Sequence, residues 1–73
     1  MGNLIMTIWV NEQRDGCGLI QACIATKNKK SAEVCHANWL QELTPQQKEG
    51  RWQVNLFTVE SWDDVPVHAL KIN

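Results

Sequence analysis

Residues 31–43, SAEVCHANWLQEL, form the one clearly amphipathic helical segment of this sequence. At about 100° per residue, its apolar side chains and one histidine fall within a single broad arc. This arc comprises Ala32, Cys35, His36, Trp39, Leu40 and Leu43. The segment therefore predicts a helix with one covered side, and only the apolar segments before and after it are available to cover that side. Ser31 is the expected N-cap, and Pro45 ends the helix because the residue before a proline is pushed out of the α conformation.

The chain before this helix is typical of an antiparallel hairpin. Residues 4–12 alternate, with one apolar face and one mixed face, as a strand with one buried side does. The first face carries Leu4, Met6, Ile8 and Val10, and the second carries Ile5, Thr7, Trp9 and Asn11. Residues 19–26 form the second expected strand, and Asp15-Gly16 between the two strands is a hairpin signal.

The chain after the helix predicts a short helix and two further strands. Thr44 and Gln47 match a capping box around Pro45, and Gly50 is expected to end this short helix in the left-handed conformation. In the expected strand 51–60 the apolar parity shifts at Phe57, which predicts either a bulge or burial on both faces. Residues 66–72 are the fourth strand, which Pro66 restricts to an edge or a strand start.

The order strand, strand, helix, strand, strand predicts an α+β fold, with one main helix packed on a four-stranded, mostly antiparallel sheet. Residues 1–73 are expected to form a single domain. A chain of this size buries only about 60% of its unfolded surface, so its stability margin is small. Two strand orders fit the pattern: a β-grasp-like order, with the first and last strands as central neighbours, and a simple antiparallel sheet.

Charge and cysteine content restrict the classes of function. The net charge is −1, so the chain lacks the basic surface that nucleic-acid binding usually requires. The alternative of a nucleic-acid-binding accessory protein depends on a small basic set, Lys27, Lys29, Lys30 and Arg51, combined with tryptophan stacking. An odd number of cysteines, the absence of a signal-peptide pattern and the lack of a long apolar run favour a cytoplasmic protein that does not cross a membrane.

The residues that could carry catalysis or bind a metal lack the expected spacing. They are Cys17, Cys23, Cys35, His36 and His68. Structural zinc ligands usually come in close pairs, and adjacent residues on a helix, such as Cys35 and His36, diverge by about 100°. We therefore expect no metal, no cofactor and no enzymatic activity, and a Cys- or metal-dependent enzyme is the second alternative. His36 is interpreted as a partly buried histidine with a hydrogen bond.

The four tryptophans are the most informative residues for function. Trp39 and Trp52 have inward positions, whereas Trp9 lies on the mixed face of its strand and Trp62 lies at a strand end. Trp9 is either an interface residue or a residue that folds over a strand edge or covers the bulge near Phe57. Tryptophan is enriched in interface hot spots. The hypothesis is a non-enzymatic regulator or inhibitor that binds a protein through an apolar sheet face and forms a homodimer. The predicted contact residues are Ile5, Thr7, Trp9, Phe57, Val59 and Trp62. In size and element order alone, the chain resembles small phage-encoded inhibitors such as some anti-CRISPR proteins, which implies an inhibitory partner interaction.

Overall fold

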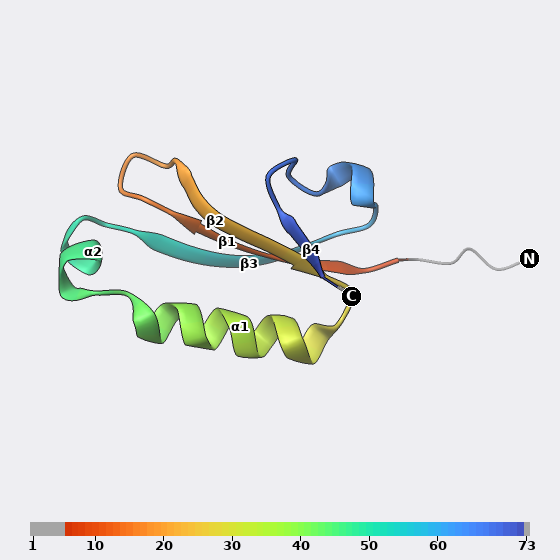
Figure 1. The fold of residues 1–73 in the computed structure, drawn as a ribbon, viewed down its shortest axis with the longest axis horizontal. Helices are drawn as coiled ribbons and strands as arrows, with labels where there is room; N and C mark the ends of the chain where they lie inside the picture. The colour runs from red at the N-terminus through yellow and green to blue at the C-terminus, as the bar shows by residue number, and fades with distance from the viewer. Residues whose placement is uncertain (1–5, 73) are drawn as a thin grey trace, which may run out of the picture.

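A computed structural model describes residues 6–72 and has the predicted order of elements (Figure 1). The strands are β1 (Ile8–Arg14), β2 (Ile20–Thr26), β3 (Gln53–Val59) and β4 (Leu70–Ile72). The helices are α1 (Lys29–Glu42), α2 (Pro45–Glu49) and the single 3₁₀ turn η1 (Trp62–Asp64). The prediction of an α+β fold with one main helix and a four-stranded, mostly antiparallel sheet is confirmed.

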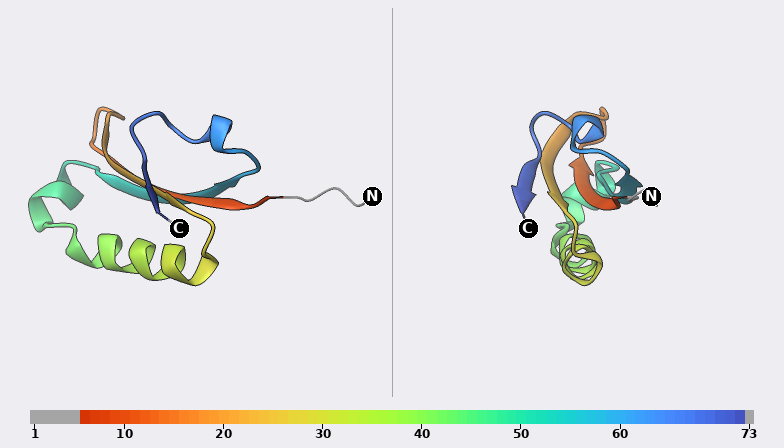
Figure 2. Two further views of the ribbon diagram at one scale, coloured as in Figure 1. Left: turned by 45° about the vertical axis from the view of Figure 1, so that its right-hand side comes forward. Right: turned by 90° about the vertical axis from the view of Figure 1, so that its right-hand side faces the viewer.

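The sheet has the order β3-β1-β2-β4, which is neither of the two expected orders. The central strand β1 is antiparallel to β2 and to β3, whereas β4 is parallel to β2. Strands β3 and β4 therefore run in the same direction, and a tight turn cannot join them. Residues 60–69, which we call the crossover, connect them across the side of the sheet opposite α1 (Figure 2).

The two sides of the sheet are covered by different segments. We call the side under α1 the helix face and the opposite side the crossover face. Asn11 of β1 bonds to α1, so the alternate residues Ile8 and Val10 point to the crossover face. There they form the main buried cluster together with Cys23, Ala25 and Val65. The helix thus does not cover the Ile8 and Val10 side, and the crossover takes that role.

Helix α1 begins two residues earlier than its predicted cap. The side-chain oxygen of Asn28 accepts a 2.9 Å hydrogen bond from the backbone N–H of Ser31, so Asn28 is the N-cap and the prediction for Ser31 is wrong. Both residue types are good caps. The backbone of Asn28 is extended directly after β2, which lets the helix start there.

The predicted capping box of α2 and its predicted end at Glu49 are confirmed, but the residue predicted to be left-handed is not. Thr44 accepts from the backbone of Gln47, whose side chain accepts from the backbone of Thr44. Gly50 has a φ of −76°, and Arg51 instead takes the left-handed conformation, with a φ of 63°. The left-handed residue therefore falls one position later than expected, and the N–H of Trp52 donates to the carbonyl of Gln47.

A close approach between the β1–β2 turn and the end of α2 requires glycine at position 16. A Cβ atom built on Gly16, in the β1–β2 turn, would overlap the carbonyl oxygen of Gly50. A Cβ atom on Gly50 would itself lie 3.2 Å from the carbonyl oxygen of Gln46. The missing side chain of Gly16 lets the hairpin turn meet the backbone at the end of α2, whereas a Cβ on Gly50 would crowd only α2 itself and Trp52.

Strand β3 contains no bulge. Its register with β1 is unbroken from the pair Ile8 and Val59 to the pair Arg14 and Gln53. The parity shift near Phe57 therefore reflects burial on both faces, which was the other prediction. The irregularity of the sheet lies between Gln13 and Arg14, next to the β1–β2 turn.

Candidate functional site

The predicted contact residues do not form one surface. Val10 pairs with Phe57, and Trp9 pairs with Thr58. Since neighbouring residues of a strand point to opposite faces, Trp9 lies on the helix face, whereas Phe57 and Val59 lie on the crossover face. The prediction that these residues share a face is therefore wrong. Thr7 is exposed before the start of β1, and Ile5 lies outside the described residues.

Trp9 is already in contact with the start of α1. Its side chain is half-buried, and the Nζ atom of Lys29 lies 5.7 Å from the centroid of its ring. This distance suits a cation–π interaction. The helix face around Trp9 is therefore not an open docking surface.

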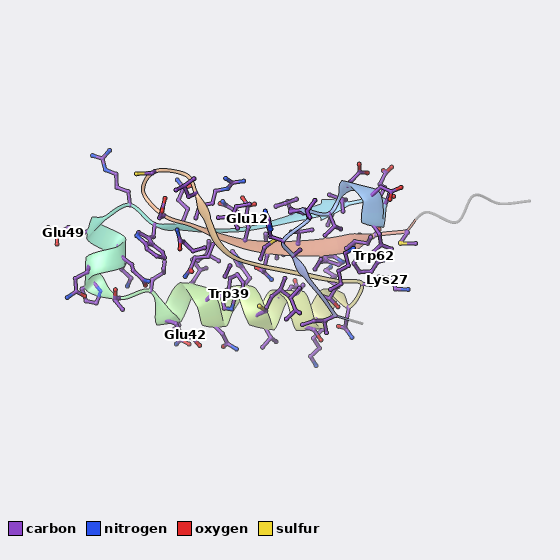
Figure 3. All side chains as sticks on the ribbon, turned by 45° about the horizontal axis from the view of Figure 1, so that its top comes forward. Glu12, Lys27, Trp39, Glu42, Glu49 and Trp62 are labelled. Atoms are coloured by element: carbon purple, nitrogen blue, oxygen red, sulfur yellow. The ribbon has the colours of Figure 1, made fainter. Side chains whose placement is uncertain are left out.

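The aromatic residues on the crossover face are also engaged within the chain. Phe57, Val59 and Trp62 are half-buried and pack against the main buried cluster. The Nζ atom of Lys71 lies 5.9 Å from the ring centroid of Trp62. Trp39, which was expected to point inward, lies on the sheet side of α1, while Trp62 comes from the crossover (Figure 3). All four tryptophans are half-buried. They lie on both sides of the sheet and do not form one common cluster.

An ion pair between the buried Glu12 and the half-exposed Arg14 lies on the crossover face. Glu12 is 6% exposed and accepts two hydrogen bonds from Arg14, of 2.8 Å from Nε and 3.2 Å from the guanidinium Nη2. The side-chain amide of Asn55 donates a third, of 3.2 Å. The hydrogen bonds from Arg14 are the main reason why the pKa of Glu12 lies below its usual value. A carboxylate bound in this way is a structural group and not a free general base.

A second polar contact joins the sheet to α1. Asn11 is 1% exposed, donates to the carbonyl of Ala32, and lies 3.2 Å from Nδ1 of His36. Because the amide nitrogen of Asn11 bonds to Ala32, its oxygen must accept from His36, which requires a proton on Nδ1. The interpretation of His36 as a partly buried, hydrogen-bonded histidine is confirmed.

The basic residues of the nucleic-acid alternative are not gathered at one place. Lys27, Lys29 and Lys30 are exposed where β2 leads into α1. Arg51 follows α2, and Figure 3 shows Lys27 and the α2 residue Glu49 at opposite ends of the molecule. A shallow pocket of about 420 Å³ lies beside the three lysines, lined by Asn28, Lys30, Ser31 and Val34.

The thiols and histidines are dispersed. Cys17 is exposed in the hairpin turn, Cys23 is buried and Cys35 is half-buried. Burial raises the pKa of the Cys23 and Cys35 thiols, which keeps both protonated and poorly nucleophilic. Among residues 6–72, no three side chains of the metal-ligating types lie close enough together to hold an ion.

The exposed apolar surface that sequence reasoning missed lies at the C-terminal edge of the sheet. Leu70 is 61% exposed and Ile72 is 43% exposed, and both belong to the edge strand β4. Leu70 pairs with Ile24, which shares the helix face with Asn11, so Leu70 and Ile72 project on the helix face. Pro66 restricted the fourth strand to an edge or a strand start; the strand is an edge strand, but it begins at Leu70 and not at Pro66. Alternation alone could not show that its apolar side would stay uncovered.

These features define a small α+β fold with a mixed sheet whose two edge strands are β3 and β4. Comparison with known proteins identified no matching family model, no similar curated protein and no similar solved structure. None of the helices described for residues 6–72 has the length and apolar character that a membrane crossing requires.

Proposed function

We propose that this chain is a non-enzymatic protein-binding domain, acting as a regulator or inhibitor, and that it binds an extended segment of its partner along β4. The observation that carries the proposal is the exposure of Leu70 and Ile72 on an edge strand. β4 has only three residues and carries Lys71, so it can offer an added strand few backbone hydrogen bonds, and the apolar side chains of Leu70 and Ile72 would supply most of the binding.

The surroundings of β4 fit an added strand. Ile72 of β4 pairs with Thr26 of β2, and the chain passes from Thr26 to Asn28, the N-cap of α1. Val34, in the first half of α1, is 52% exposed and lines the shallow pocket there. An incoming strand would place alternate side chains on the helix face, next to Leu70 and Ile72, where apolar residues would lose contact with water.

A displayed library of random peptides provides the test, because selection from such a library does not require the partner to be identified first. Peptides selected on the wild-type protein should contain alternating apolar residues, and they should shift the backbone amide resonances of residues 70–72. Leu70→Glu should weaken the binding of a selected peptide by about tenfold or more, because a charge replaces the central apolar contact.

Leu19→Glu is the matched control. Leu19 is the same residue type, is 64% exposed, and lies in the β1–β2 turn rather than at β4. It should leave peptide binding unchanged. If no peptide binds, or if Leu70→Glu binds peptides as well as the wild type does, β4 is not the binding edge and the proposal is wrong.

The two alternatives remain hypotheses with separate tests. Nucleic-acid binding would depend on Lys27, Lys29 and Lys30, and it would weaken steeply as salt is added. A Cys-dependent enzyme would require one thiol that is unusually reactive at neutral pH. Of the three thiols, Cys17 alone is exposed, and its location in a hairpin turn provides no neighbouring base within the contacts described.

A further inference from the structure

The opposite edge of the sheet has a different chemical character from β4. Strand β3 bonds to β1 along all seven of its residues, and no other strand lies beyond it among residues 6–72. Its outward backbone groups therefore face solvent. Natural proteins usually protect such an edge with lysine, proline, a bulge or a very short strand.

Strand β3 has none of these protections. Its sequence, QVNLFTV, contains no charged residue and no proline, and its register with β1 is regular throughout. It is more than twice as long as β4, which has three residues. A regular, uncharged seven-residue edge is a template for pairing with another strand.

We infer that a second copy of this chain pairs with β3, so that two antiparallel β3 strands join the two sheets into one. A twofold axis perpendicular to the sheet must place one residue opposite its own copy. With the axis at the middle of the strand, that residue is Leu56. Val54 then lies opposite Thr58 of the second copy, and Asn55 lies opposite Phe57. No two like charges face each other anywhere along this pairing.

The charges that flank β3 favour the antiparallel orientation. Arg51 precedes the strand and Glu60 follows it, and both are exposed. Antiparallel pairing brings Arg51 of each copy within one residue position of Glu60 of the other copy, at both ends of the interface. Parallel pairing would instead place each charge beside its own copy, and like charges facing each other across strands are destabilising.

The same pairing covers apolar surface that one chain leaves half-buried. Leu56 lies opposite Asn11 in the register, so it belongs to the helix face. In the paired sheet the two Leu56 side chains meet on that face, and both α1 helices lie on the same side. Seven paired residues supply about six to eight backbone hydrogen bonds. This inference goes beyond the proposed function, because it uses β3 and leaves β4 open.

The first test is the mass of the full chain in solution, measured by light scattering during size exclusion. The wild type is expected to be a dimer, and Thr58→Lys is expected to weaken it by about tenfold or more, because a lysine on the edge must lose water on pairing. Thr58 is exposed, so the substitution leaves the buried residues in place. Gln41→Lys introduces the same charge at an exposed position of α1, outside β3, and should leave the dimer intact.

The second test examines orientation through the flanking charges. Arg51→Glu and Glu60→Arg should each weaken the dimer by about three- to tenfold at low salt, since two symmetry-related pairs are lost. The double variant should recover the wild-type affinity, because the pair is restored with its signs exchanged. Circular dichroism checks that each variant is folded.

Three results would overturn the inference. The first is a wild-type protein that is monomeric at its highest soluble concentration. The second is a Thr58→Lys variant that is folded and dimerises as tightly as the wild type. The third is a double charge variant that dimerises more weakly than either single variant. Should Thr58→Lys not fold, Gln53→Lys tests the same edge at another exposed position. None of these results affects the proposal for β4, which is tested by peptide binding.

Discussion

The side-chain amide of Asn11 in β1 donates a 2.9 Å hydrogen bond to the main-chain carbonyl of Ala32 in α1. Both residues are at most 1% exposed, so this bond joins the helix to the sheet out of contact with water. A buried hydrogen bond of this kind determines where along the sheet the helix sits, because a shift of the helix would leave a buried polar group without a partner.

Asn11→Leu should lower the free energy of unfolding by about 1–3 kcal/mol, because it leaves the Nδ1 proton of His36 without its acceptor. Urea denaturation followed by circular dichroism measures the change. Asn38→Ala, on the exposed side of α1, is the control and should shift stability by no more than about 0.5 kcal/mol. Equal effects of the two substitutions would show that the Asn11 contact contributes nothing specific.

Gly16→Ala should destabilise the protein more than Gly18→Ala. A Cβ atom at Gly16 overlaps the carbonyl oxygen of Gly50, so the hairpin turn and the end of α2 must separate. Gly18 has a φ of 84° but no neighbour within 4 Å, so alanine there incurs only the strain of a left-handed residue, about 1 kcal/mol. Thermal unfolding of both variants measures the two losses of stability. A larger loss for Gly18→Ala than for Gly16→Ala would contradict the close approach between Gly16 and Gly50.

Asn28→Ala should cost about 1 kcal/mol of stability, the usual effect of removing an N-cap. Ser31→Ala should be nearly neutral, because Ser31 contributes its backbone N–H and not its hydroxyl group to the cap. Chemical denaturation of the two variants distinguishes the observed start of α1 from the start that the sequence predicted. A larger loss for Ser31→Ala would favour Ser31 as the cap.

The stability contributed by Glu12 should depend on pH in the acidic range. Hydrogen bonds from Arg14 lower the pKa of Glu12 below its ordinary value of 4.5, so the folded state releases this proton more readily than the unfolded chain does. The contribution is therefore complete above pH 4.5 and is lost as the pH falls through the lower pKa of the folded state.

Glu12→Gln measures this contribution. The difference in unfolding free energy between wild type and variant should be largest near neutral pH and should shrink as the pH falls below 4.5. The pKa of Asp15 is also lowered, chiefly by the backbone N–H of Leu19, but Asp15 is present in both proteins and cancels in the difference. A difference that does not change with pH would show that the ion pair does not form.

Cys17 should react with a water-soluble thiol reagent well before the other two cysteines do. It is exposed, whereas burial shields Cys23 and Cys35 and raises the pKa of both. The folded protein should therefore show one fast thiol per chain, and the denatured protein should show three. Cys17→Ser removes the fast phase if the assignment is correct.

The short-range features of this chain could be predicted because they depend on residues within a few positions of one another. The capping box at Thr44 and Gln47 and the turn at Asp15 and Gly16 both occur where the sequence placed them. The two errors at helix ends have a local cause as well. Asn28 and Ser31 are both good caps, and a left-handed residue can fall at Gly50 or one position later at Arg51.

What the sequence by itself determined was therefore the type and order of the elements. Only the tertiary structure decided which side of β1 lies under α1, because both sides of that strand carry large apolar residues and alternation does not distinguish them. It also decided that the crossover covers Ile8 and Val10, which forces β4 to be parallel to β2 and moves the open surface from a sheet face to the two edges. Strand order arises from contacts between residues far apart in the chain, and no local pattern of side chains records it.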